Sequence, residues 1–202
     1  MASSSILDLF RTSVERTPSQ LAVDEGNDFG LSYRQLDVES SRLAGRLRNV
    51  GIDKWKPIPL LASSCSDMVV GVLGILKAGA SYVPVDRAQW PQEKVDYVLK
   101  RVEANVIVYT GDRPDIRNRQ VKCVAVERAK DWDASHTAVS QCHDCHTDTM
   151  CVIFTSGTTD KPKGVILTHH SVLNLVSSPP FNFGVLPGDR LLLVLSIAFD
   201  GK

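Results

Sequence analysis

Apolar residues recur along this chain with two different periods, and the two alternate. Short apolar runs bounded by turn residues predict strands, whereas apolar residues three or four positions apart predict one face of a helix. The predicted strands are Leu21–Val23, Leu31–Tyr33, Ile58–Leu61, Ser81–Pro84, Asn105–Tyr109, Val121–Val126, Cys151–Phe154 and Val165–Leu167. The predicted helices are Ile6–Val14, Leu36–Val50, Met68–Leu76 and Pro91–Leu99. This alternation predicts an α/β fold with a largely parallel sheet flanked by helices.

Two stretches lack an apolar period and predict loops. They are residues 112–119 and 130–149, and the second belongs to a polar linker at about 128–149. The last apolar run, Leu191–Phe199, is continuous and predicts a strand buried on both faces. Left uncovered, such a strand is an open sheet edge, so we expect self-association or binding of a complementing chain.

The composition of the chain limits the classes of protein to which it can belong. The chain has 202 residues, and 43% of them are hydrophobic, which suits one globular domain. Its 23 basic and 23 acidic side chains cancel, so neither nucleic acid nor a membrane surface is expected as a partner. No apolar run reaches the roughly 18 residues of a spanning helix, and the first residues do not resemble a secretory signal. Five irregularly spaced cysteines predict reduced thiols and a cytoplasmic location.

The segment richest in chemistry is Phe154–Val165, a polar loop between two apolar runs. Hydroxyl residues surround Gly157, and Lys161 and Lys163 follow before Gly164. Small residues let the backbone approach a ligand, hydroxyl and N–H groups donate hydrogen bonds, and lysines neutralise charge. These properties predict a polyphosphate site, with an ordinary polar turn as the alternative. The common P-loop does not apply, because no Gly-Lys-Ser/Thr sequence occurs.

The loop sequence TSGTTDKPKG resembles TSGTTGxPKG, the phosphate-binding signature of the adenylate-forming enzymes. This superfamily includes acyl-CoA synthetases, luciferases and the adenylation domains of nonribosomal peptide synthetases. Leu31–Leu36 resembles its motif L-[ST]-Y-x-E-L, Leu76–Asp86 resembles LKAGGAYVPID, and Phe199–Asp200 resembles the Phe-Asp that opens the substrate pocket. The Tyr-Val-Pro-Val-Asp sequence and the final Phe-Asp favour the peptide-synthetase branch.

The resemblance extends from about Ile6 to Asp200 and implies a fold. Residues 1–202 are expected to form a partial adenylation domain, equivalent to the first part of the family's large N-terminal domain. The family's small C-terminal lid domain, with its catalytic lysine, has no counterpart in these residues. We therefore assign no catalytic residue within the chain.

The resemblance also implies ligands. ATP with Mg²⁺ is the implied nucleotide, and the implied substrate is an amino acid whose α-ammonium group pairs with Asp200. The alternative for Asp200 is an exposed carboxylate without a ligand. We interpret Lys161 as a solvated turn residue and His169 as a packing residue at a helix start. The implied phosphate-binding residues are Thr155, Ser156, Gly157, Thr158, Thr159, Lys163 and Gly164.

Asp160 is the main departure from the family signature, which usually has glycine there. Aspartate tolerates a left-handed backbone better than most residues, so the turn itself is compatible with it. A carboxylate beside a polyphosphate adds a repulsion of about 1 kcal/mol per close charge pair. We expect weakened nucleotide binding, unless Asp160 points to solvent.

Cys142–His146 has the sequence C-x-x-C-H, which occurs at c-type haem attachment sites and in half of a zinc site. We expect neither haem nor structural zinc. Haem attachment requires export, and no second cysteine/histidine pair has structural-zinc spacing.

Three functional hypotheses follow from the resemblance. The first is a truncated adenylation domain whose ancestral activity is ATP-dependent formation of an aminoacyl-AMP and which is not competent alone. The second is a split adenylating enzyme completed by another chain. The third is a non-catalytic binding or scaffold protein, able to dimerise, in a secondary-metabolite pathway.

Overall fold

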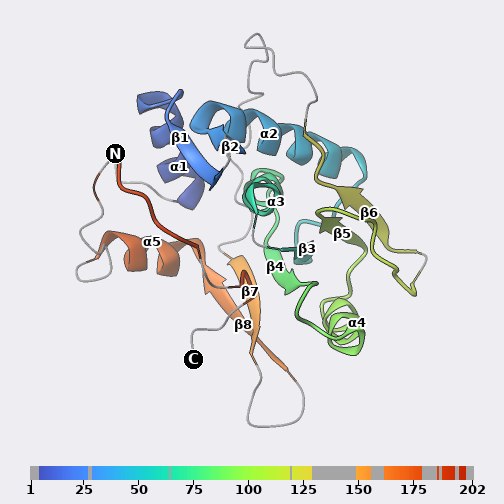
Figure 1. Cartoon of the computed structure of the whole chain (residues 1–202). Coiled ribbons are helices and arrows are strands. Elements are labelled where there is room, and N and C mark those ends of the chain that lie inside the picture. The colour runs from blue at the N-terminus through green and yellow to red at the C-terminus, as the bar shows by residue number, and fades with distance from the viewer. Residues whose placement is uncertain are drawn as a thin grey trace.

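The residues described by the computed structural model form two β-sheets (Figure 1). The structure describes residues 5–26, 29–63, 65–118, 120–128, 149–155, 162–178, 186, 188–193 and 196–198. A two-stranded antiparallel sheet pairs β1 (Leu21–Gly26) with β2 (Phe29–Ser32). A six-stranded sheet has the order β6-β5-β3-β4-β7-β8. Its strands are β3 (Ile58–Ala62), β4 (Tyr82–Asp86), β5 (Val106–Tyr109), β6 (Lys122–Ala125), β7 (Thr149–Thr155) and β8 (Lys163–Thr168).

Five helices accompany the sheets in the described residues. They are α1 (Ile6–Arg16), α2 (Tyr33–Asn49), α3 (Ser66–Lys77), α4 (Gln92–Arg101) and α5 (His169–Ser177). The first five strands of the large sheet run parallel, and only β8 is antiparallel to its neighbour β7. The predicted α/β class and largely parallel sheet are therefore confirmed.

The central strands β3 and β4 of the large sheet are buried on both faces. Leu60 packs in a core with α2 and α3, while its neighbour Leu61 packs on the opposite face with Val95 and Val98 of α4. Figure 1 shows α2 and α3 on one side of these strands and α4 on the other. Double-sided burial explains why β3 is apolar along its whole length rather than alternating.

Close backbone packing holds α3 against its neighbours. A Cβ atom placed on Gly71 would lie 2.7 Å from Leu60 Cδ1, and one on Gly74 would lie 2.5 Å from Leu43 Cδ2. Glycine at these two helical positions lets α3 approach both β3 and α2. The close packing of α3 against β3 and α2 compensates for the low helix propensity of these two glycines.

A partly buried lysine links the end of α3 to α2. The Lys77 ammonium group donates to the Asp37 carboxylate at 2.6 Å and carbonyl at 2.8 Å, and to the hydroxyls of Ser40 and Ser41 at 2.7 and 3.0 Å. Burial lowers the pKa of Lys77, and the Asp37 charge opposes that shift. The motif that contains Lys77 therefore has a structural role at this position.

Two predicted elements differ from the structure. Tyr33 begins α2 instead of ending a strand, because Ser32 and Gln35 form a capping box that starts the helix. The described part of Leu191–Phe199, residues 191–193 and 196–198, contains no strand, so that prediction is wrong for those residues. Leu191, Leu192 and Leu193 are exposed, and an isolated apolar run has no ladder partner to fix it as a strand.

Candidate functional site

The polar loop joins the two strands of the β7–β8 hairpin. Thr155 at the end of β7 lies opposite Lys163 at the start of β8, and Phe154 lies opposite Gly164. Lys163 is exposed and Thr155 is partly buried. A hydroxyl and an ammonium group thus flank the two ends of the loop, which is a suitable pair of groups for an anionic ligand.

Gly164 has a packing role in this hairpin. A Cβ atom at this position would lie 3.0 Å from Val152 Cγ1 and 3.4 Å from Phe154 Cζ, both on β7. Glycine therefore lets β8 lie close to the side chains of β7 directly after the loop. This packing role holds whether or not a phosphate binds.

Helix α4 contacts the closing end of the loop. The half-buried Tyr97 hydroxyl donates to the Pro162 carbonyl at 3.3 Å, one residue before Lys163. Sequence reasoning missed Tyr97, because its partner is 65 positions away. The apolar spacing of α4 indicated a helix but contained no signal for this contact.

A segment near the end of the chain is held at the edge of the sheet where the carboxyl ends of the parallel strands lie. Asp86, buried at the end of β4, accepts backbone N–H bonds from Ala88 at 3.0 Å and Gln89 at 3.2 Å through Oδ1. Its Oδ2 accepts the Ser196 hydroxyl at 2.5 Å, and Ser196 Oγ accepts the Ala198 N–H at 3.2 Å. Asp86 thus fixes residues 196–198 at the end of β4.

This anchor lies on the same sheet edge as the start of the polar loop. Strands β4 and β7 are parallel neighbours, so Asp86 and Thr155 end at one edge. In open parallel sheets this carboxyl edge is where ligands bind. In the sequence Asp86 is only the last residue of the Leu76–Asp86 motif, which contains no signal for its contact with Ser196.

Several residues singled out in the sequence lie outside the described residues. They are Ser156, Gly157, Thr158, Thr159, Asp160, Lys161, Asp200 and the Cys142–His146 segment. His169 is described: it is the first residue of α5 and is 4% exposed, which agrees with a packing role.

In the described part of the chain, no three His, Cys, Asp or Glu side chains are arranged to hold a metal ion. Within the same residues, no helix combines the length and apolarity needed to cross a membrane.

Cys151 precedes the loop but is not an activated nucleophile. It is buried in β7, and burial raises the pKa of its thiol, so the reactive thiolate is disfavoured. Burial likewise raises the pKa of Tyr82 beside it. The chemistry of this region therefore does not include covalent catalysis by Cys151.

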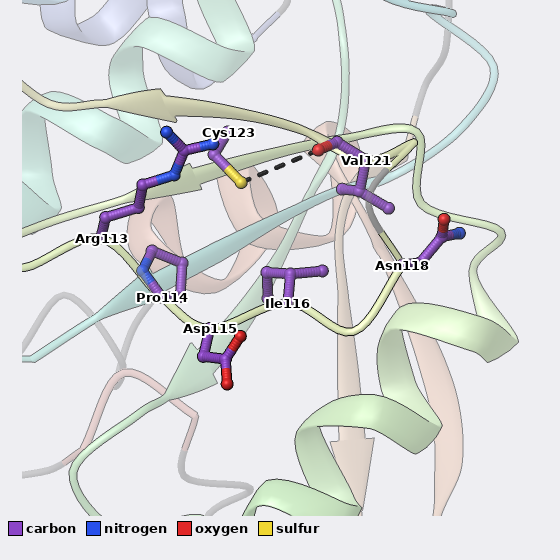
Figure 2. Close-up of a pocket in the computed structure, with 7 residues that line it drawn as sticks. All are labelled: Arg113, Pro114, Asp115, Ile116, Asn118, Val121 and Cys123. Atoms are coloured by element: carbon purple, nitrogen blue, oxygen red, sulfur yellow. Dashed lines mark hydrogen bonds between the residues drawn. The ribbon is translucent and has the colours of Figure 1, made fainter.

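A pocket of about 360 Å³ lies elsewhere, on the segment that joins β5 to β6 (Figure 2). Cys123 points toward it, and its thiol contacts the Val121 carbonyl at 3.8 Å. The lining residues are Arg113, Pro114, Asp115, Ile116, Asn118, Val121 and Cys123. Strands β5 and β6 lie at the opposite end of the sheet from β8, so this pocket is separate from the hairpin.

The donor set at the hairpin fits a nucleotide phosphate. Thr155 supplies a hydroxyl, Lys163 supplies a positive charge, and Gly164 keeps the strand backbone free of a side chain. For Mg²⁺ the fit rests on the phosphates themselves, which supply oxygen ligands together with water. These features define the hairpin and the adjoining carboxyl edge as the candidate site.

Known proteins resemble this chain in both sequence and fold. A profile of the AMP-binding enzyme family matches residues 10–202. The chain is 47% identical over 200 residues to the nonribosomal peptide synthetase echPS of Aspergillus ruber, which covers 98% of the chain and 10% of that protein. The chain thus spans about a tenth of this relative's length.

Solved structures agree with the fold. The AMPPNP-bound form of the nonribosomal peptide synthetase FmoA3 matches with a TM-score of 0.76 at 26% identity, covering 99% of the chain and 21% of that protein. The N-terminal subdomain of Klebsiella oxytoca NpsA, in complex with 3-hydroxybenzoyl-AMSN, matches with a TM-score of 0.76 at 22% identity. That match covers 96% of the chain and 48% of the NpsA chain.

Proposed function

This chain belongs to the AMP-binding enzyme family, as the N-terminal part of a nonribosomal peptide synthetase adenylation domain, and from that premise we propose that it provides the ATP phosphate-binding portion of an amino-acid-activating unit. The observation that supports this most is the β7–β8 hairpin. It brings Thr155 and Lys163 together at the two ends of the signature loop. The AMPPNP-bound form of a similar synthetase gives independent support for a nucleotide ligand.

The reaction of such a unit joins a carboxylate to AMP. A carboxylate oxygen of the amino acid attacks the α-phosphorus of ATP, the bond to the bridging oxygen breaks, and aminoacyl-AMP and pyrophosphate form. Positioning and charge stabilisation account for most of the rate in phosphoryl-transfer chemistry. When bound, Mg²⁺ would neutralise part of the phosphate charge.

The residues of this chain have roles in binding and orientation. Lys163 neutralises phosphate charge, and the hydroxyls from Thr155 onward donate hydrogen bonds to phosphate oxygens. Asp86 anchors Ser196, and four residues later in the sequence is Asp200, which in this proposal pairs with the substrate ammonium group. The nucleotide and amino-acid parts of the site would then meet at one sheet edge.

These 202 residues do not complete the reaction by themselves in our proposal. The family also uses residues around the adenine and ribose, and a lysine on a C-terminal lid domain, and none of these is assigned within the chain. A split enzyme is the second candidate, and the exposure of Leu191, Leu192 and Leu193 favours it. A complementing polypeptide could cover those side chains.

Amino-acid-dependent exchange of pyrophosphate into ATP tests this proposal. We would assay the purified chain with each of the common amino acids, with the Lys163→Ala variant as background. The expected result is no exchange above that background for the chain alone. Exchange by the chain alone would overturn the proposed incompleteness, and exchange only after addition of a second polypeptide would select the split enzyme.

A further inference from the structure

The segment that joins β5 to β6 encloses a cavity apart from the candidate site (Figure 2). Parallel neighbouring strands are usually joined by a helix, which covers one face of the sheet. Here the described residues 110–118 and 120–121 contain no helix. They lie on the same face of the sheet as α4, because Ile116 and Val121 pack in the same core as Val98. This irregular segment fills the face incompletely and leaves a cavity of about 360 Å³.

The apolar wall of the cavity is held in place by the turn before β6. Pro114 is buried, and Ile116 and Val121 are partly buried. The side-chain carbonyl of Asn118 accepts the Gln120 N–H at 3.0 Å, and its backbone carbonyl accepts the Val121 N–H at 3.1 Å. These two bonds fix the turn, so the wall forms without a ligand. The volume of the cavity is within the range of small-molecule pockets.

Arg113 contributes a positive charge to the lining. Among the described residues, nothing pairs with the Arg113 guanidinium group, whereas nearby Arg117 pairs with Asp96 at 3.3 Å. Figure 2 shows the Arg113 side chain extending toward Cys123, while the Asp115 side chain points away from both. A guanidinium group binds a carboxylate through paired hydrogen bonds. The cavity thus combines an apolar wall with one cation suited to an anionic group.

We propose that this cavity binds a small organic acid that has one carboxylate and a compact apolar body. Arg113 pairs with the carboxylate, and Pro114, Ile116 and Val121 contact the apolar part. A phosphate is less suitable, because the Asp115 carboxylate also lines the cavity and a single arginine offsets only one negative charge. The cavity is separate from the β7–β8 hairpin, so this binding does not involve the phosphate loop.

Titration of the isotope-labelled 202-residue chain with 3-phenylpropionate tests this site, because the probe has one carboxylate and one ring. Two-dimensional NMR follows the amide signals of Ile116, Val121 and Cys123, and we expect saturable shifts at these residues. The neutral analogue 3-phenylpropionamide has the same shape without the charge and should bind about fivefold more weakly or worse. Acetate, which lacks the ring, and inorganic phosphate should also bind about fivefold more weakly or worse.

Arg113→Gln tests the cation. The variant should bind 3-phenylpropionate about fivefold more weakly or worse, because it loses a charged hydrogen-bond donor. Arg113 is exposed and pairs with no other described residue, so the fold should persist, and circular dichroism verifies this. Arg117→Gln is the matched control, because Arg117 does not line the cavity and pairs with Asp96. This control should bind the probe as wild type does.

Cys123 gives a second readout of occupancy. Its thiol lines the cavity and is partly buried, so a bound probe should protect it from iodoacetamide. With the probe at about three times its dissociation constant, the alkylation rate should fall about fourfold, in proportion to the empty fraction. Trypsin cleavage after Lys122 and Arg128 places Cys123 in its own peptide for mass spectrometry. Cys65 is also partly buried but lies outside the lining, so its rate should not change.

Several results would overturn the proposal. They are absence of saturable shifts at the cavity residues, equal binding of the amide, acetate or phosphate, and equal affinity in the wild-type and Arg113→Gln chains. An equal loss in Arg117→Gln would show a general effect of surface charge. Alkylation of Cys123 that the probe does not slow would place the bound probe outside the cavity. Either of these last two results would also reject the site.

Discussion

Asp160 is the residue at which this chain departs from its family's loop, and its charge can be tested directly. Asp160→Gly should tighten MgATP binding about tenfold, because it removes a carboxylate that repels the phosphates by about 1 kcal/mol or more. Isothermal titration calorimetry measures the change. Asp160→Asn is the control for shape, because it removes the charge and retains the size. An unchanged affinity in both variants would mean that Asp160 faces solvent.

We propose that Tyr97 positions the closing end of the loop, because its hydroxyl donates to the Pro162 carbonyl. Tyr97→Phe removes only that hydroxyl, so we expect MgATP affinity to fall about two- to fivefold, as for one neutral hydrogen bond. The midpoint of thermal unfolding should change little. Tyr33→Phe, in α2, serves as the matched control. Equal loss of affinity in both variants would contradict a specific role for Tyr97.

Residues of the candidate site could be predicted only where they lie close together in the sequence. Lys163 and Gly164 could be found because they belong to a contiguous motif. Tyr97 and Asp86 could not, because their partners lie 65 and 110 positions away and meet them only after the sheet forms. The sequence around Tyr97 or Asp86 contains no pattern that indicates which distant residue will be its hydrogen-bond partner.

At the scale of elements, the packing of α3 against α2 depends on glycine. Gly74→Ala would place a Cβ atom 2.5 Å from Leu43 Cδ2. We expect the free energy of unfolding to fall by about 1–3 kcal/mol, as in other overpacked cores. Gly45→Ala is the control, because a Cβ atom there meets nothing within 4 Å. It should raise the stability of α2 by up to about 1 kcal/mol through helix propensity. Urea unfolding compares the two, and destabilisation of both would contradict the packing account.

The contact between β1 and α3 should make stability depend on pH. The Glu25 carboxylate accepts hydrogen bonds from the Ser66 N–H and, at 2.7 Å, from the Ser66 hydroxyl, and these bonds with nearby Arg128 hold the pKa of Glu25 below its ordinary value of 4.5. A lowered carboxylate pKa stabilises the fold above pH 4.5, and this contribution is lost as pH falls through the folded-state pKa.

Glu25→Gln measures that contribution. At pH 7 the variant should be less stable than wild type by about 1 kcal/mol, the worth of a partly exposed charge-assisted bond. The difference should shrink as pH falls below 4.5 toward the folded-state pKa. Urea unfolding at pH 7 and at acid pH gives both values. A difference independent of pH would show that the charge of Glu25 is not the cause.

Most elements could be predicted from apolar periodicity, because burial on both faces of the sheet or on one face of a helix leaves a local pattern. The errors occurred where another contact decides the conformation. Ser32 and Gln35 start α2 at Tyr33 through a capping box. Leu191, Leu192 and Leu193 form no strand, because strand formation requires a partner that periodicity does not reveal.

At the scale of the whole molecule, hydrophobic cores cover both faces of the central strands of the large sheet, whereas the outer strand β8 is largely exposed. Strands β3 and β4 are shielded by helices, whereas β8 exposes apolar side chains on both faces. The signature loop joins β7 to the outer strand β8, so the candidate site and the exposed strand belong to one hairpin.

Titration of the purified chain with MgATP tests most directly whether the hairpin is a phosphate site. We expect saturable calorimetric binding by the wild-type chain and about tenfold weaker binding by Lys163→Ala, the effect of losing one charged hydrogen-bond donor. Lys54→Ala, which removes the same charge from the turn before β3, should bind as wild type does. Absence of binding, or equal affinity in the wild-type and Lys163→Ala chains, would contradict the account.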